Sequence, residues 1–149
     1  MTMPHLENCS HQSDGWCLAC VKTLWEKHHN LVEHRPWGTY EVLLDAIYCK
    51  VKRISIKENS RISLQRHKHR AEVWTCVSGV LMVQLGKRLN ELNHQFLYPG
   101  DVITIPRGHI HRATSVGTGC GAVFIETQTG DYFGESDIER FEDDFGRIS

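Results

Sequence analysis

Two short segments, separated by a long stretch of chain, constrain this sequence more than any other feature. The first, QRHKHRAE, runs from Gln65 to Glu72 and is followed by Gly79; the second, GDVITIPRGHIH, runs from Gly100 to His111. Each combines side chains that can bind a metal with Gly or Pro residues that favour turns. A fold that uses both segments must bring residues far apart in the sequence to one point.

Strand geometry explains how these side chains could converge. Successive residues of a strand point to opposite faces, so Gln65 and His67 share one face, and His69 extends the same series. A small barrel can direct inward side chains from several strands at one point. We therefore predict that one divalent ion (zinc, manganese, cobalt or a similar metal) is held by Gln65, His67, Glu72 and His111. His69 has three alternatives: a ligand in place of Gln65, a group that orients a ligand, or a residue facing solvent.

Length and charge exclude several classes of protein. A chain of 149 residues supports one domain with a core, and 17 basic against 18 acidic residues give a net charge of −1. This balance argues against a nucleic-acid or membrane-surface partner. No apolar run has the length of a membrane span, and no export signal opens the chain. We therefore expect reduced cysteines and a cytoplasmic protein.

Residues 1–34 differ from the rest of the chain, and we divide the protein into this Cys/His-rich segment and a domain of residues 35–149. Apolar residues at helical spacing predict a short helix from Trp16 to His29. A structural zinc knuckle is one interpretation of this segment, and an ordinary tail of reduced cysteines is the other. The candidate zinc ligands are Cys9, His11, Cys17 and Cys20.

From Trp37 onward, short runs of β-forming residues alternate with turn signals. The predicted strands are Tyr40–Leu44, Cys49–Ile56, Arg61–His67, Glu72–Ser78, Leu81–Leu85, Phe96–Tyr98, Val102–Ile105, His111–Ser115 and Ala122–Thr129. Many short strands at near-regular spacing favour an all-β sandwich or barrel, such as a double-sheet jelly roll. The acidic tail Glu135–Phe145 is expected to carry a short helix.

The two opening segments resemble the two metal-binding motifs of the cupin superfamily, with Gln65 in the place of a family His. Further blocks, at Arg35–Tyr40, Ile62–Trp74 and Gly130–Arg147, resemble the type II mannose-6-phosphate isomerase domain. This resemblance implies a double-stranded β-helix, a divalent metal, and the interconversion of mannose 6-phosphate and fructose 6-phosphate. The family domain usually follows a guanylyltransferase half, which this chain lacks, so we expect a stand-alone domain without that activity.

The resemblance also suggests roles for residues around the ligands. His69 is the candidate base that moves the proton, and Arg70 and Arg112 are the candidate partners of the substrate phosphate. The chain departs from the family pattern at Arg66, Lys68, Val73 and Ser115. These departures leave the metal ligands intact and bear on the identity of the substrate.

Two other functions compete with a sugar-phosphate isomerase. One is a non-catalytic cupin that binds a sugar or sugar phosphate as a sensor or accessory module. The other is a small metal-dependent dioxygenase, which Gln65 disfavours because oxygen chemistry at iron usually uses more imidazole ligands. Many cupins pair through edge strands, so a homodimer is one expectation for the quaternary structure.

Overall fold

The computed structural model describes residues 32–117 and 119–148, and these fold mainly into strands. The strands are β1 (Val32–Arg35), β2 (Gly38–Asp45), β3 (Cys49–Ile56), β4 (Leu64–His67), β5 (Arg70–Ser78), β6 (Val80–Gly86), β7 (Asn93–Leu97), β8 (Val102–Ile105), β9 (Ile110–Val116), β10 (Ala122–Gly130) and β11 (Ile138–Glu142). Single 3₁₀ turns span Leu89–Glu91 and Glu135–Asp137.

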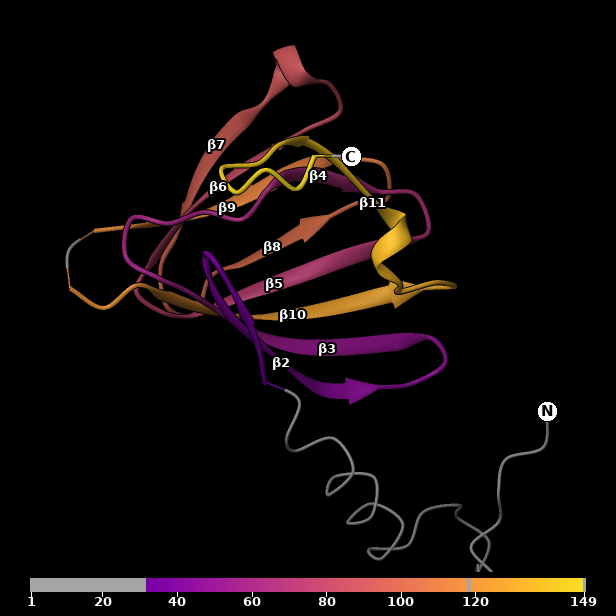
Figure 1. Ribbon diagram of the computed structural model, residues 1–149, viewed down its shortest axis with the longest axis horizontal. Coiled ribbons are helices and arrows are strands. Elements are labelled where there is room, and N and C mark those ends of the chain that lie inside the picture. The colour runs from indigo at the N-terminus through magenta and orange to yellow at the C-terminus, as the bar shows by residue number, and fades with distance from the viewer. Residues whose placement is uncertain (1–31, 118, 149) are drawn as a thin grey trace, which may run out of the picture.

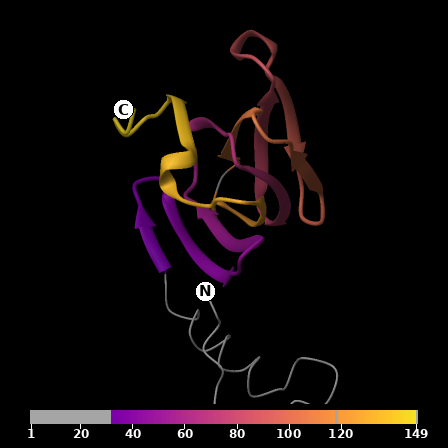
Figure 2. The same ribbon diagram turned by 90° about the vertical axis from the view of Figure 1, so that its right-hand side faces the viewer.

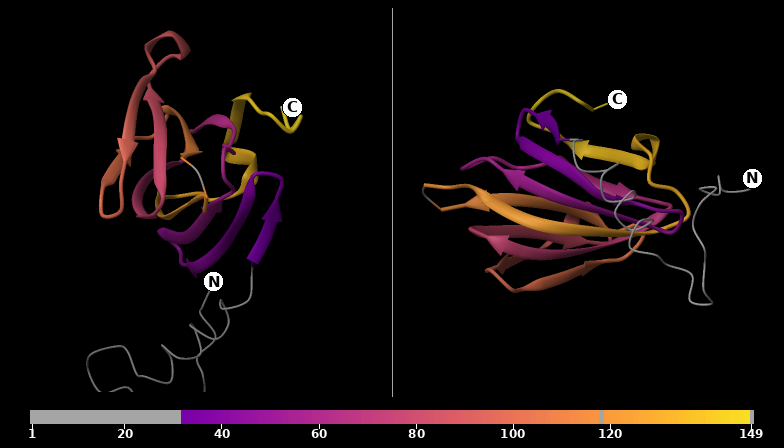
Figure 3. Two further views of the ribbon diagram at one scale, coloured as in Figure 1. Left: turned by 90° about the vertical axis from the view of Figure 1, so that its left-hand side faces the viewer. Right: turned by 90° about the horizontal axis from the view of Figure 1, so that it is seen from below.

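The strands form two antiparallel sheets that face each other (Figure 1). The larger sheet has the order β1-β2-β3-β10-β5-β8, and the smaller has the order β11-β4-β9-β6-β7. Views from the two sides show the same two layers, with the C-terminal segment lying at one end of the sandwich (Figures 2 and 3). The all-β, double-sheet architecture predicted from the sequence is therefore confirmed.

The predicted strands lie where the structure has strands, and β3 and β8 have the predicted bounds. The tail is the main difference. Its expected short helix is confined to the 3₁₀ turn Glu135–Asp137, and the chain then continues as β11, which was not predicted. This strand exists because it pairs with β4, where Ile138 lies opposite His67 and Arg140 lies opposite Gln65. Such a long-range partner overrides the local preference of an acidic segment.

The sheet also extends further toward the N-terminus than predicted, because β1 pairs with β2 from Val32 onward. The predicted helix from Trp16 to His29 and the candidate zinc knuckle (Cys9, His11, Cys17 and Cys20) lie outside the described residues. In the part of the chain that the structure describes, no helix is long and apolar enough to cross a membrane.

Inward side chains change from apolar to polar along three neighbouring strands of the larger sheet. In the apolar half, the rings of Trp74 and Phe124 pack with centroids 4.8 Å apart. Further along the same strands, Gln128 of β10 lies opposite Glu72 of β5. On its other side, β10 pairs with β3 so that the polar parts of these two strands are also adjacent. The antiparallel register therefore aligns the polar halves of the strands. One end of the sandwich holds the hydrophobic core, and the other end holds a polar pocket.

The turn between β5 and β6 depends on a glycine. Gly79 has a φ of +73°, and a Cβ atom on it would meet the Gly121 carbonyl oxygen and the Cα of Ala122. Gly108 has nearly the same φ, +75°, but nothing lies within 4 Å of the corresponding Cβ position. Both glycines avoid backbone strain, and Gly79 also avoids a collision with backbone atoms that cannot move aside.

We predict that Gly79→Ala destabilises the domain by several kcal/mol, whereas Gly108→Ala costs only about 1 kcal/mol because it adds strain without a collision. The measurement is urea-induced unfolding of both variants and the wild type. Equal losses of unfolding free energy in the two variants would show that the close approach of Gly79 to the neighbouring loop does not restrict this position to glycine.

Candidate metal centre and its pocket

Three buried side chains converge between the two sheets. They are His67 from β4, Glu72 from β5 and His111 from β9, and their ligand atoms all lie within 4.8 Å of one another. His67 Nε2 lies 3.1 Å from Glu72 Oε1, and His111 Nε2 lies 3.5 Å from Glu72 Oε2. This arrangement of two imidazoles and one carboxylate suits a first-row divalent ion.

The orientation of both histidine rings also fits a metal. His111 Nδ1 lies 2.9 Å from the carbonyl oxygen of His109, and His67 Nδ1 lies 3.4 Å from that of Asp137. A ring that donates from Nδ1 to a carbonyl keeps the lone pair on Nε2, and metal-bound histidines usually have such a partner. His111 Nε2 is buried without a hydrogen-bond partner. Burial lowers the pKa of His111 to about 4, so its lone pair is free at neutral pH.

Glu72 is ionised despite complete burial. Its Oε2 accepts a hydrogen bond from Trp74 Nε1 at 3.0 Å, and its Oε1 accepts one from Arg70 Nε at 3.2 Å. Burial alone would raise the pKa of Glu72, but its polar neighbours His67, His111 and Arg70 hold it well below its ordinary value. The site therefore presents a fixed negative charge to a cation.

The fourth predicted ligand, Gln65, lies beside the three. It pairs with His111 across β4 and β9, and its Nε2 lies 3.4 Å from His67 Nε2. Its Oε1 is 2.6 Å from Ser63 Oγ, which donates to it. Rotating the amide by half a turn would place the oxygen toward His67 and let the nitrogen donate to Ser63. In that orientation the amide oxygen of Gln65 would face His67 Nε2, beside the three clustered ligands.

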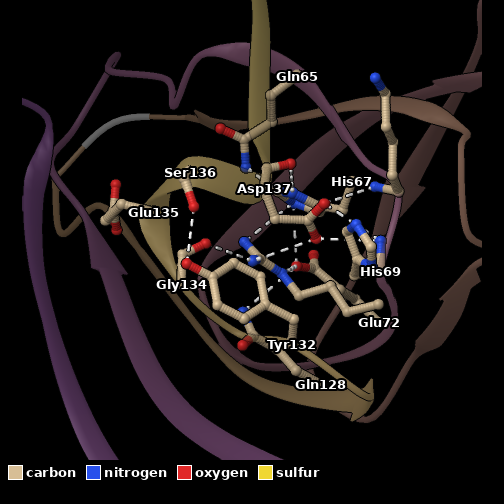
Figure 4. A network of polar contacts seen from close by, with 12 residues as sticks. Gln65, His67, His69, Glu72, Gln128, Tyr132, Gly134, Glu135, Ser136 and Asp137 are labelled. Carbon is tan, nitrogen blue, oxygen red and sulfur yellow. Dashed lines mark hydrogen bonds and ion pairs between the residues drawn. The ribbon is translucent and has the colours of Figure 1, made fainter.

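The C-terminal segment holds the turn between the ligand-bearing strands β4 and β5 (Figure 4). Asp137 Oδ1 accepts the backbone N–H groups of Lys68 at 2.8 Å and His69 at 3.1 Å. The Gly134 carbonyl oxygen accepts Arg70 Nη1 at 3.2 Å. Asp137 is buried and its role was not foreseen from the sequence, although it lies in the block that carries the family resemblance.

Two of the three predicted catalytic residues, Arg70 and Arg112, are already engaged by protein groups. Arg70 is buried within the site, and its donors are engaged by Glu72 and Gly134. Arg112 lies outside the pocket and bonds Glu142 through Nη1 at 3.0 Å and Nη2 at 3.3 Å. It follows His111 in β9, so its side chain points to the opposite face of the sheet.

His69 is not brought together with the ligands. Its side chain is 55% exposed, and its Nδ1 lies 3.5 Å from Asp131 Oδ1. It faces solvent beside the ring of Tyr132, in the turn between β4 and β5 rather than on the inward face of a strand. Of its three predicted alternatives, the structure shows the exposed one.

The departures from the family pattern lie outside the pocket, contrary to the expectation that they would shape the substrate site. Arg66 points outward from β4 and pairs with Glu139 of β11 at 2.7 Å. Val73 follows Glu72 in β5 and therefore faces away from the metal ligands. Lys68 is exposed in a turn, and Ser115 is buried elsewhere in β9. None of the four lines the pocket.

The pocket is bounded by Gln65 and Glu72 on one side and by the C-terminal segment on another. It is a partly open pocket whose space is continuous with solvent. Its walls carry Arg35, Trp37, Tyr40, Lys52, Gln65, Glu72, Glu126, Gln128, Glu135, Arg140 and Arg147 among others. Of the cations, Arg35 pairs with Glu33 and Arg140 with Glu135. Lys52 has no carboxylate within ion-pair distance among the described residues.

Glu126 is a pocket residue that the sequence reasoning missed. It is buried on the inward face of β10, and its Oε1 accepts a hydrogen bond from Gln128 Nε2 at 2.7 Å. Burial, reinforced by the charge of Glu72, raises its pKa to about 7. Alternation along the predicted strand Ala122–Thr129 would have found it, because Phe124, Glu126 and Gln128 share one face.

Comparison with known proteins gives consistent findings. A family model described as "Mannose-6-phosphate isomerase C-terminal" matches residues 22–143. Alginate biosynthesis protein AlgA of Pseudomonas syringae pv. tomato is 41% identical over 123 residues, which are 82% of this chain and 24% of that protein. Xanthan biosynthesis protein XanB of Xanthomonas campestris pv. campestris is 42% identical over 115 residues, 76% of this chain and 23% of that protein. The chain thus spans about a quarter of the length of these relatives.

Solved structures agree on the fold. Oxalate decarboxylase from Bacillus subtilis superimposes with a TM-score of 0.66 at 17% identity, covering 78% of this chain and 31% of that one. At this identity the likeness concerns the fold alone. It confirms the double-stranded β-helix that was expected from the two segments.

The raised pKa of Glu126 predicts a pH-dependent stability of the metal-free protein. Folded protein keeps this proton up to about pH 7, whereas the group ordinarily loses it near 4.5. The folded state therefore binds more protons between these values, and the free energy of unfolding falls as the pH rises through this window. The Glu126→Gln side chain cannot ionise. Between pH 5 and pH 8, the free energy of unfolding of the wild type should therefore fall by up to about 3 kcal/mol relative to that of this variant. Urea unfolding at several pH values measures the difference. If the unfolding free energies of the two proteins changed equally with pH, the prediction would be contradicted.

Proposed function

The chain belongs to the family of mannose-6-phosphate isomerase C-terminal domains, and from this premise we propose that it interconverts mannose 6-phosphate and fructose 6-phosphate with one divalent metal ion. The observation that carries the proposal is the buried cluster of His67, Glu72 and His111, of which Glu72 also lines a polar pocket. Family membership supports a sugar-related cupin. The isomerase activity is inferred from the cluster and the pocket together.

His67, Glu72 and His111 would hold the ion, with Gln65 as a further oxygen ligand. When bound, a divalent ion supplies a Lewis acid that stabilises negative charge developing on the sugar oxygens. The protein supplies the rest of the site. Arg70 fixes the carboxylate of Glu72, and carbonyl oxygens fix the tautomers of both imidazoles. Rigid ligands of this kind keep the reacting carbons in one place.

The substrate phosphate needs a cation other than Arg70 or Arg112, because both are already engaged by protein groups. Lys52 is the strongest candidate. It projects from β3 into the pocket, with Nζ 4.7 Å from the centroid of the Tyr40 ring, and it is only partly buried. Arg140, whose partner Glu135 is exposed, is a second cation on the opposite wall. A sugar phosphate bound between them would place its other end toward the metal ligands.

The metal assignment predicts that His67→Ala and His111→Ala each weaken binding of a divalent ion by roughly two powers of ten or more, because too few protein ligands remain. The matched control is His94→Ala, since His94 is exposed on β7, away from the cluster. Metal content after dialysis and calorimetric titration with zinc or manganese measure the effect. Full metal content in both pocket variants would place the metal elsewhere.

The functional assignment predicts metal-dependent turnover of mannose 6-phosphate in a coupled isomerase assay. Lys52→Ala should raise KM for the phosphorylated sugar by roughly 10- to 100-fold, because a charge-assisted contact contributes about 1.5–3 kcal/mol. Turnover of unphosphorylated mannose should change much less. Arg53→Ala is the control, since Arg53 follows Lys52 in β3 but points to the outer face, where it pairs with Glu41.

Two other outcomes have distinct meanings. Saturable binding of mannose 6-phosphate without turnover in any of several divalent metals would replace the isomerase with a non-catalytic sugar-phosphate-binding domain. An equal effect of Lys52→Ala on phosphorylated and unphosphorylated sugars would remove Lys52 from the phosphate site while leaving the reaction in place.

A further inference from the structure

One carboxylate in the pocket has a position that the metal site does not explain. Glu126 lies on the inward face of β10 and is only 5% exposed, yet it lines the pocket. Its Oε1 is occupied by Gln128 Nε2. Among the described residues, no donor reaches its Oε2 and no cation lies within ion-pair distance of the carboxylate. The second carboxylate oxygen of this pocket-lining residue is therefore not engaged by a described protein donor.

Gln128 fixes this carboxylate next to the metal ligands. The same Nε2 atom donates to Glu126 Oε1 at 2.7 Å and to Glu72 Oε1 at 3.4 Å. Two carboxylates that share one donor nitrogen lie within reach of a single small molecule. A sugar whose oxygens bind an ion held by Glu72 and the two imidazoles would thus lie beside Glu126.

The other titratable groups around the pocket are poorer candidates for proton transfer. Glu72 has both oxygens engaged and belongs to the metal cluster. Asp137 uses its carboxylate to hold two backbone N–H groups. Burial raises the pKa of the Tyr40 phenol to about 12, which removes it as a base near neutral pH. Glu135 is largely exposed and paired with Arg140.

We propose that Glu126 is the catalytic base of the isomerisation and carries the proton between C2 and C1 of the sugar phosphate. This assignment rests on the proposed isomerase function. It replaces His69, which lies outside the pocket. Gln128 acts as a positioning residue that holds the carboxylate in place.

The step is balanced without any oxidant or second substrate. The carboxylate takes the proton from C2 of the aldose, the C2–H electron pair becomes the C1=C2 bond, and the carbonyl pair moves to O1. The resulting acid then returns its proton to C1. O2 loses its proton as C2 becomes a carbonyl, and O1 gains one, so the net change is aldose to ketose. A single base on one face of the enediol suffices for both transfers.

The electrostatic surroundings support this role. Burial, followed by the charge of Glu72, raises the pKa of Glu126, while Lys52 from β3, Arg70 from β5 and His67 from β4 act in the opposite direction. In the metal-free protein the outcome is a pKa of about 7. Burial is the largest cause and does not depend on a bound ion, and a raised pKa lets a carboxyl group both accept and donate a proton. A carboxyl group with no role in proton transfer would not need a raised pKa.

The test compares Glu126→Gln with the wild type. The amide has nearly the same size and can still accept the hydrogen bond from Gln128, but it cannot accept a proton from carbon. We expect kcat to fall by roughly 10²- to 10⁴-fold. KM, metal content and calorimetric binding of fructose 6-phosphate should stay within about threefold of the wild type, because the amide keeps the size and polarity of the side chain. Glu139→Gln is the control, because Glu139 pairs with Arg66 on the surface and does not line the pocket.

A second variant covers the case in which the amide disturbs the fold. Glu126→Ala leaves a space the size of a small carboxylate, so added formate should restore part of the lost kcat if the missing function is proton transfer. Hydrogen exchange supplies an independent readout. The wild type should exchange the sugar C2 hydrogen with solvent water during turnover, and Glu126→Gln should lose this exchange together with the isomerisation.

The outcomes separate this inference from the function on which it rests. Absence of turnover in the wild type with every tested metal overturns the isomerase proposal and the role of Glu126 with it. Turnover in the wild type that stays within about tenfold in Glu126→Gln overturns the role of Glu126 alone, since a catalytic base contributes more than this. A folded, metal-bound Glu126→Ala that is inactive and gains nothing from formate also overturns it.

Discussion

The buried negative charge of Glu72 is the constraint on which the rest of this structure depends. A carboxylate with 1% exposure is costly unless it is surrounded by donors and cations. Trp74, Arg70 and Gln128 supply the donors, and they come from the neighbouring strands β5 and β10 of the larger sheet. His67 and His111 approach the same carboxylate from the smaller sheet. Neutralising this charge therefore ties the two sheets together at the polar end, and a bound cation would complete the balance.

The C-terminal segment belongs to this arrangement rather than forming a loose tail. β11 pairs with β4, and Asp137 holds the turn that joins the two ligand-bearing strands. The same segment contributes Arg140 and Glu135 to the pocket wall. The geometry of the metal ligands and the shape of the pocket thus depend on one piece of chain. This explains in physical terms why the blocks that resemble the family include the end of the domain as well as the two ligand motifs.

Stability and proposed chemistry are divided between the two ends of the sandwich. The apolar end packs aromatic and aliphatic side chains, whereas the polar end buries Glu72 and Glu126 in one pocket. Burial of Glu126, reinforced by the nearby charge of Glu72, raises the cost of ionising this carboxyl group, and this cost appears as its raised pKa. A protein that needed only a stable barrel would gain by placing apolar residues there. The polar pocket is therefore the part of the structure that function, rather than folding, accounts for.

The sequence by itself determined the β architecture, the turn glycines and the metal-competent residues, because period-two alternation and ligand spacing are local properties of the chain. The central strands were predicted well for this reason. The tertiary structure decided what local patterns do not encode. Sequence neighbours of the ligands proved to be remote from the pocket: His69 lies in an exposed turn, and Arg112 faces the opposite side of its strand. Conversely, Glu126, Lys52 and Asp137 reach the site through strand pairings between distant segments. Alternation shows which side chains share a face, but only the packing of the two sheets decides which face becomes the interior.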